Sequence, residues 1–196
     1  MFEVFAQYLE KMIPGLTKDQ VNLVRSKCVM KKLRKKQGLL QEGEICRNKI
    51  FVVKGLLRNY NIAENGYEYI VRFTDAGGWT TDPESYYSGL PSEYNIEAIE
   101  PSEVILFSRE DFETLKQLVP AMVEFSERVI TKNASLIQKR VLMNISASAE
   151  EKYMDFISSF PNIFNRVPLH MVASYLGVSR ETLTRIRQGL AITAKE

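Results

Sequence analysis

The sequence predicts an α+β fold in which an N-terminal β sandwich or barrel precedes a long helix and a C-terminal helix-turn-helix. Three observations lead to this prediction. Short segments rich in Val, Ile, Tyr and Phe alternate with turns between residues 29 and 108. An apolar heptad repeat follows in residues 121–145, and two short amphipathic segments flank Gly177. We therefore expect three parts, residues 1–118, 119–146 and 147–196.

The composition is that of an ordinary globular protein of one or two domains. The 196 residues are 45% hydrophobic and 26% charged, with a net charge of +2. Total charge therefore gives no indication of nucleic-acid binding, but positions 162–190 hold four arginines (166, 180, 185 and 187) and one acidic residue, Glu181. No secretory signal is visible and no apolar run approaches the roughly 20 residues of a membrane span, so we expect a cytoplasmic protein with no membrane partner.

The N-terminal segment is expected to form two short helices. Residues 1–12 carry apolar side chains at spacings of three and four, and Thr17 is placed to cap the second helix. Five lysines and one arginine follow at positions 27–36. Such a run could bind nucleic acid. Because Val29 and Leu33 alternate with its cations, we favour the polar face of an edge strand.

Turn signals separate the β segments of residues 29–108. The strongest is Glu64-Asn65-Gly66, because Asn-Gly tolerates positive φ at both central positions of a tight hairpin. Several short strands at this spacing predict a sandwich or a barrel.

Residues 121–145 are expected to form one long helix that ends at a hinge near residues 146–149. Its apolar residues repeat at heptad spacing: Val123, Ile130, Ala134, Ile137 and Val141. This seam could pack against the helix's own domain. A helix with apolar residues over six turns needs a partner along its length, however, so we favour a homodimer.

Residues 169–188 have the pattern of a helix-turn-helix. Pro168 is suited to the start of the first helix, and Gly177 supplies a turn with positive φ. Ser179 is placed as the N-cap of the second helix, and Leu183 and Ile186 form the apolar side of that helix.

The second of these helices carries the residues that could read DNA. Arg180, Glu181 and Arg185 fall within roughly 140° of one another at 100° per residue, away from the apolar side. Arginine can bond to guanine O6 and N7, and a carboxylate can accept from cytosine N4. We expect Ser179 and Thr182 to hold phosphate oxygens. The set of expected DNA-binding residues is completed by Arg187. The alternative is an ordinary helical hairpin with a solvated charged face.

The segment VSRETLTRIR resembles the recognition helix of the Crp/Fnr transcription regulators. In that family, the residues matching Arg180, Glu181 and Arg185 read base edges, and those matching Ser179 and Thr182 touch phosphates. The resemblance implies a sequence-specific regulator that binds double-stranded DNA as a homodimer on an inverted repeat. It also implies RNA polymerase as a partner. Because only residues 189–196 follow the motif, we expect the family's β-hairpin wing to be reduced.

The β segments resemble the jelly roll of cyclic-nucleotide-binding domains, whose pattern KGLLR-x-Y…G-x-E occurs at 54–60 and 66–68. In that family a Gly-Glu pair opens a short helix and binds the ribose, and a following arginine binds the cyclic phosphate. The matching positions here are expected to be Gly78, Trp79, Ser92 and Glu93.

The matching positions lack the family's arginine and add a carboxylate, which would repel a phosphate. We therefore predict that the chain does not bind cyclic AMP in the family's manner, and whether another small effector exists stays open. Trp79 could form the wall of a different pocket, but a tryptophan in a sandwich is more often part of the core.

Catalysis and metal binding find no support in the sequence. His170 is the only histidine, which argues against a histidine zinc site or a catalytic triad. Cys28 and Cys46 lack metal-ligand spacing and are expected to be buried thiols, with a redox pair as the weaker alternative. We expect no enzyme, no metal and no cofactor. The remaining alternative to a regulator is a small-ligand-binding or protein-interaction module without specific DNA readout.

Overall fold

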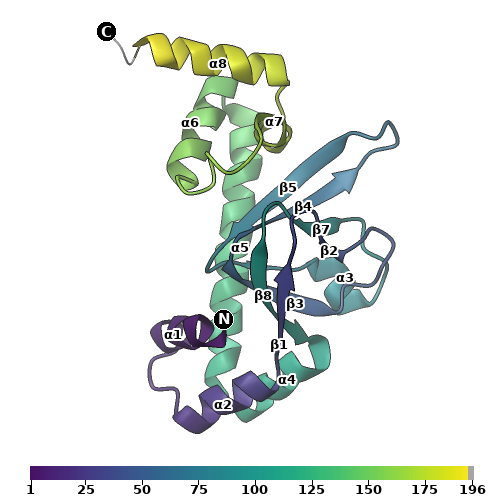
Figure 1. The fold of residues 1–196 in the computed structure, drawn as a ribbon, viewed down its shortest axis with the longest axis vertical. Helices are drawn as coiled ribbons and strands as arrows, with labels where there is room; N and C mark the ends of the chain where they lie inside the picture. Colours follow the sequence, from purple (N-terminus) through teal and green to yellow (C-terminus); the bar gives the residue numbers. More distant parts are fainter. Residues whose placement is uncertain (194–196) are drawn as a thin grey trace. The chain divides into compact units, whose positions relative to one another are not determined.

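The computed structural model describes the backbone of residues 1–193 and the side chains of residues 1–190 (Figure 1). Contacts group the described chain into two compact units. The first unit comprises Met1–Asn61 and Arg72–Lys132, and the second comprises Ile62–Val71 and residues 133–193. The expected division into residues 1–118, 119–146 and 147–196 is a division by function and stays a prediction. No helix in the described range is both long and apolar enough to cross a membrane.

Two four-stranded antiparallel sheets form the predicted jelly roll. Their orders are β1-β8-β3-β6 and β2-β7-β4-β5. The strands are β1 (Val29–Leu33), β2 (Gly38–Leu40), β3 (Asn48–Lys54), β4 (Leu56–Ile62), β5 (Glu68–Asp75), β6 (Trp79–Thr80), β7 (Asn95–Ala98) and β8 (Ser102–Ser108). β1 is an edge strand, and it holds two cations of the basic run, Lys31 and Lys32, so the assignment to a sheet edge is confirmed for these two. The other cations of the run, Lys27, Arg34, Lys35 and Lys36, lie outside the strand.

Alternate residues of β3 and β8 face two different cores, as the period of two in a strand requires. Ile50 and Val52 pack with Leu57, Ile96 and other residues between the two sheets. Phe51 and Phe107 point the other way and pack against helices. These helices are α1 (Phe2–Met12), α2 (Lys18–Ser26), α4 (Arg109–Leu118) and the start of α5 (Ala121–Ser146). Figure 1 shows α1, α2 and α4 gathered around the N-terminal part of α5.

The predicted cap at Thr17 is confirmed. Its hydroxyl accepts from the backbone N–H of Gln20 at 3.2 Å, and the Gln20 side chain accepts from the N–H of Thr17 at 3.0 Å. This reciprocal pair satisfies two of the N–H groups that a helix start leaves without partners. The capping box therefore fixes where α2 begins.

The hairpin turn at Asn65 is present, but its predicted backbone was wrong. The N–H of Gly66 donates to Ala63 O at 2.8 Å, and the N–H of Ala63 donates to Tyr67 O at 3.0 Å. Among the described residues, Lys36 is the one non-glycine with positive φ, so Asn65 has negative φ and Gly66 alone is left-handed at 78°. This is a three-residue loop with a glycine bulge, not a two-residue turn.

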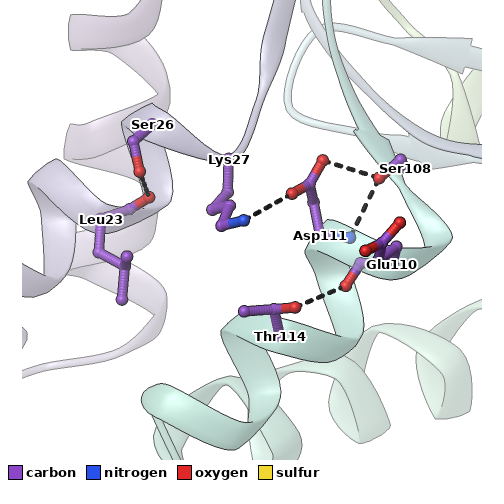
Figure 2. A network of polar contacts seen from close by, with 7 residues as sticks. All are labelled: Leu23, Ser26, Lys27, Ser108, Glu110, Asp111 and Thr114. Atoms are coloured by element: carbon purple, nitrogen blue, oxygen red, sulfur yellow. Dashed lines mark hydrogen bonds and ion pairs between the residues drawn. The ribbon is translucent and has the colours of Figure 1, made fainter.

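A polar network joins the end of α2 to the start of α4 (Figure 2). The Lys27 ammonium lies 3.0 Å from Asp111 Oδ1, and Ser108 Oγ donates to Asp111 Oδ2 at 2.8 Å. Ser108 also caps α4 by accepting from the N–H of Asp111 at 3.0 Å. The Lys27 and Ser108 hydrogen bonds hold the pKa of Asp111 below its usual value.

Candidate nucleic-acid interface and effector cassette

The predicted helix-turn-helix is confirmed in the second unit. It consists of α7 (Leu169–Leu176) and α8 (Arg180–Thr193), preceded by α6 (Ala149–Ser159). Pro168 is the N-cap residue of α7, and Gly177 ends that helix at φ 66°, in the left-handed region. The N–H of Gly177 and that of Val178 bond back to carbonyls of α7, so the turn closes on itself. Figure 1 shows α6, α7 and α8 grouped together.

A small apolar core supports this motif. Val172, Ala173 and Leu176 of α7 are buried, and Leu183 of α8 is fully buried. The rest of the core comes from α6 and the loop after it: Tyr153, Phe156, Ile163 and Val167. Aromatic rings join these parts, with Phe156 at 5.6 Å from Tyr175 and Tyr153 at 5.9 Å from Phe164 between ring centroids. The motif is therefore a packed scaffold on which exposed side chains can be held.

Ser179 caps α8 as the sequence predicts. Its hydroxyl accepts from the N–H of Thr182 at 3.0 Å and donates to Thr182 Oγ1 at 3.0 Å. The other N–H groups at this helix start point outward, and their partial positive charge favours an anion. Ser179 and Thr182 thus lie where a phosphate could be held.

The base-reading candidates of α8 share one exposed face. Arg180, Glu181 and Arg185 are all exposed, opposite the buried Leu183. Within the described part of the chain, no hydrogen bond or ion pair joins these three side chains to another group. Two guanidinium forks and one carboxylate are therefore available to an incoming ligand.

Arg187 is also exposed, about 20° around the helix from Arg180, so its place in the DNA-binding set stays a prediction. Its guanidinium lies 5.7 Å from the centre of the Phe164 ring, and its charge and hydrogen bonding act on the pKa of the Tyr153 hydroxyl, which burial raises. Sequence reasoning missed Gln188, an exposed residue about 80° around the helix from Arg180. Counting the helical angle two turns further would have found it.

The segment expected to carry at most a short wing continues the helix, in agreement with that expectation. α8 extends through Gly189 to Thr193. Residues 194–196, the rest of that expectation, lie outside the described residues. The C-terminal motif as described therefore presents helices alone to a ligand.

The heptad residues of α5 lie on an exposed apolar stripe. Val123, Ile130, Ile137 and Val141 are 40%, 50%, 58% and 51% exposed, and Ala134 between them is exposed as well. Exposed apolar side chains continue toward the C-terminal end of the helix at Leu142 and Ile145. The first turns of α5 are anchored through the buried Met122, Phe125 and Ser126.

The effector candidate Trp79 belongs to the core and not to a pocket. Its indole lies 5.2 Å from Phe51 and 5.7 Å from Phe107 between ring centroids, and its N–H donates to the Tyr8 hydroxyl at 3.2 Å. The short helix α3 (Pro83–Ser88) opens at Asp82, whose carboxylate caps it. The position expected at Trp79, where the family's glutamate opens this helix, is therefore held by Asp82.

The effector cassette is the expected set Gly78, Trp79, Ser92 and Glu93. Apart from Trp79, its residues are hydrogen-bonded, tightly packed or exposed to solvent. Ser92 is buried, and its hydroxyl donates to Asp82 Oδ2 at 2.6 Å. Glu93 is exposed, with its carbonyl accepting from Asn61 at 2.8 Å. A Cβ at Gly78 would lie 2.7 Å from the Thr74 methyl, so the backbone there packs too closely for a side chain. Ser92, bonded to the buried Asp82 carboxylate, thus lies where the family's arginine would be needed for a cyclic phosphate.

Both cysteines are free thiols. Burial raises the pKa of Cys28 to about 11, so this thiol is protonated and weakly nucleophilic at neutral pH. Cys46 is buried, and its backbone N–H donates to Ser85 Oγ at 2.9 Å. Within the described residues, no group of three or more His, Cys, Asp or Glu side chains is arranged to hold a metal ion.

Comparisons with known proteins agree with this architecture. Residues 30–117 match the cyclic nucleotide-binding domain family. FixK2 from Bradyrhizobium japonicum superimposes with a TM-score of 0.74 at 19% identity, covering 85% of this chain and 86% of that one. The c-di-GMP responsive global regulator CLP of Xanthomonas campestris gives 0.74 at 11% identity, covering 91% and 93%. No curated protein matches the sequence.

A Eubacterium rectale protein described as a regulator of the Crp/Fnr family superimposes with a TM-score of 0.70 at 16% identity, covering 94% of this chain and 89% of that one. Residues 30–117 are therefore similar to cyclic nucleotide-binding domains, and the chain shares the fold of the Crp/Fnr-family structure and of FixK2.

Proposed function

We propose that this chain is a transcription regulator that binds an inverted repeat in double-stranded DNA as a homodimer. The observation that carries the proposal is the exposed face of α8, where Arg180, Glu181 and Arg185 have no partner among the described residues. Leu183, on the opposite side of the helix, is fully buried. CLP is a global regulator linked to virulence gene expression, which agrees with a regulatory role for this fold.

The chemistry of that face fits the major groove. An α-helix fits the width of the groove, and bidentate arginine contacts to guanine contribute roughly 1–3 kcal/mol of discrimination each. Glu181 lies between the two arginines around the helix and would accept from cytosine N4. Ser179 and Thr182, at the start of α8, would fix the register on the phosphate backbone.

The exposed stripe on α5 supports the dimer. One recognition helix contacts too few bases for useful selectivity, whereas two roughly double the specific free energy. Ile130, Ile137 and Val141 would be covered by the same residues of a second copy, as in a symmetric coiled coil. The recognition helices would then enter successive major grooves, and the regulator could contact RNA polymerase from the bound site.

The jelly roll is proposed to act without cyclic AMP. The Asp82 carboxylate already has the Ser92 hydroxyl and the α3 backbone as partners. A cyclic phosphate would meet Ser92 in place of the family's arginine and the Glu93 carboxylate beside it, with no cation from these positions to pair with it.

The test is to select duplexes from a random library and measure their affinity for the wild type and for Arg180→Ala. We expect the variant to lose about 10- to 100-fold on the selected site and much less on random DNA, because a base contact is lost along with one charge. Lys132→Ala, which removes an exposed charge from α5, is the control for net charge. Equal losses on both kinds of DNA would contradict base reading.

A further inference from the structure

The edge of β5 is covered by a side chain of the helix-turn-helix. β5 is the last strand of its sheet, so one side of it has no neighbouring strand. The Ser174 hydroxyl of α7 accepts from the N–H of Ile70 at 2.9 Å and donates to the Glu68 carbonyl at 2.6 Å. One serine thus satisfies two backbone groups that an open sheet edge would leave to solvent.

Arg140 of α5 binds both the strand and the motif. Its guanidinium donates to Ile70 O at 3.0 Å, to Val71 O, and to Tyr175 O at 2.9 Å. It also stacks 4.1 Å from the centre of the Tyr175 ring. A single planar cation therefore connects α5, β5 and α7, all within the second unit.

The carbonyl of Tyr175 explains why a cation is suited to this place. It belongs to the last turn of α7, where carbonyls have no partner within the helix and the helix dipole is negative. The rigid fork of an arginine can bond several carbonyls at once, which the single ammonium of a lysine cannot do with the same geometry.

The contacts leave the reading face open. The contacts of Arg140 and Ser174 involve α7 and not α8. Arg180, Glu181 and Arg185 of α8 therefore remain exposed. We propose that Arg140 and Ser174 are positioning residues, Arg140 holding α7 on the dimer helix α5 and Ser174 holding α7 on β5, and that they thereby set the half-site spacing that the dimer accepts. This inference rests on the proposed DNA-binding function.

Spacing preference is the measurement that separates positioning from general stability. Duplexes with one selected half-site, or with two half-sites at spacers changed by one or two base pairs, are titrated against wild type, Arg140→Met and Ser174→Ala. Arg140→Met keeps an apolar stem beside Tyr175 while removing the donors. The controls are Lys132→Met, an equal charge change on the same helix, and Ser158→Ala, whose hydroxyl bonds only to Asp155 O in its own helix at 3.1 Å.

We expect both test variants to bind the preferred spacing about tenfold more weakly and to lose most of their preference over altered spacers, because Arg140→Met removes charge-assisted hydrogen bonds and Ser174→Ala removes two neutral ones. Binding to the single half-site should match wild type, which also shows that the motif is folded. Unchanged spacing preference would overturn the inference, and so would tighter binding, which would make the contact inhibitory. If wild type bound no duplex, the proposed function itself would fail. The contact can be tested separately by hydrogen exchange, because loss of the Ser174 hydroxyl in Ser174→Ala should speed exchange of the Ile70 amide.

Discussion

Replacing Ile137 with alanine should weaken the dimer without unfolding the protomer. Ile137 is 58% exposed on the apolar stripe of α5, so its side chain contributes little to the protomer core. Alanine also has a higher helix propensity than isoleucine, which keeps α5 intact. The substitution therefore acts on the surface that a second copy would cover.

The expected magnitude follows from the area still exposed. Fully burying an isoleucine contributes about 1.5–3 kcal/mol. Covering the remaining 58% of Ile137 would then contribute about 1–2 kcal/mol in each protomer. Both copies lose it in a symmetric dimer, so the dissociation constant should rise roughly 20- to 300-fold.

Analytical ultracentrifugation over a concentration series measures this constant directly. Gln138→Ala is the matched control, because Gln138 is the next residue on α5 and is exposed but polar. We expect it to change the constant less than about threefold. The reasoning would be refuted if Ile137→Ala and Gln138→Ala had the same small effect, or if the wild type stayed monomeric at millimolar concentration.

Three further predictions concern the first unit. Gly55→Ala should lower the free energy of unfolding by about 2–4 kcal/mol, because Gly55 has φ 98° and a Cβ there would lie 2.1 Å from Ser102 Oγ; chemical denaturation should find Gly38→Ala, which has open space, nearly neutral. Asp111→Asn should destabilise most at pH 7 and progressively less as the pH falls below about 4, because a carboxylate with a lowered folded-state pKa stabilises above its unfolded pKa of about 3.9 and loses this as the pH falls through the folded-state value; a difference that stayed the same as the pH fell would contradict the contact with Lys27. Calorimetry with cyclic AMP should detect no binding at micromolar affinity, and a measurable micromolar constant would reverse our interpretation of the cassette.

Features that depend on neighbours in the sequence could be predicted. The caps at Thr17 and Ser179 each need a hydroxyl and an N–H three residues on, and both partners are visible in the sequence. The turn at Gly177 needs only a residue that tolerates positive φ. The strand alternation and the heptad spacing likewise follow from local periodicity.

Features that depend on register were harder to predict. The cassette was expected to open at Trp79, three residues before the cap at Asp82, because the segment offers no unique start signal. In the structure Trp79 belongs to the two-residue strand β6 and packs among aromatic rings beside α1. Asp82, three residues later, is therefore the residue that caps α3. Asn65 shows the same limit, since Asn-Gly is compatible with more than one loop length.

Contacts between distant parts of the chain were not predictable from one sequence. Ser174 and Glu68 are 106 residues apart, and nothing local to either residue indicates the other. Arg140 looks like any surface cation of a long helix until the carbonyls around it are placed. The closeness of the Arg187 guanidinium to the Phe164 ring was likewise not visible in the sequence.

The strand β5 belongs to both compact units, with residues up to Val71 in one and residues from Arg72 in the other. Neither unit can therefore be excised by a single cut. A fragment starting at residue 133 would lack the strand that Ser174 and Arg140 bind, and one ending at Lys132 would expose that strand's edge. Domain-swap experiments with this protein should exchange the hairpin together with the C-terminal segment, or keep the chain whole.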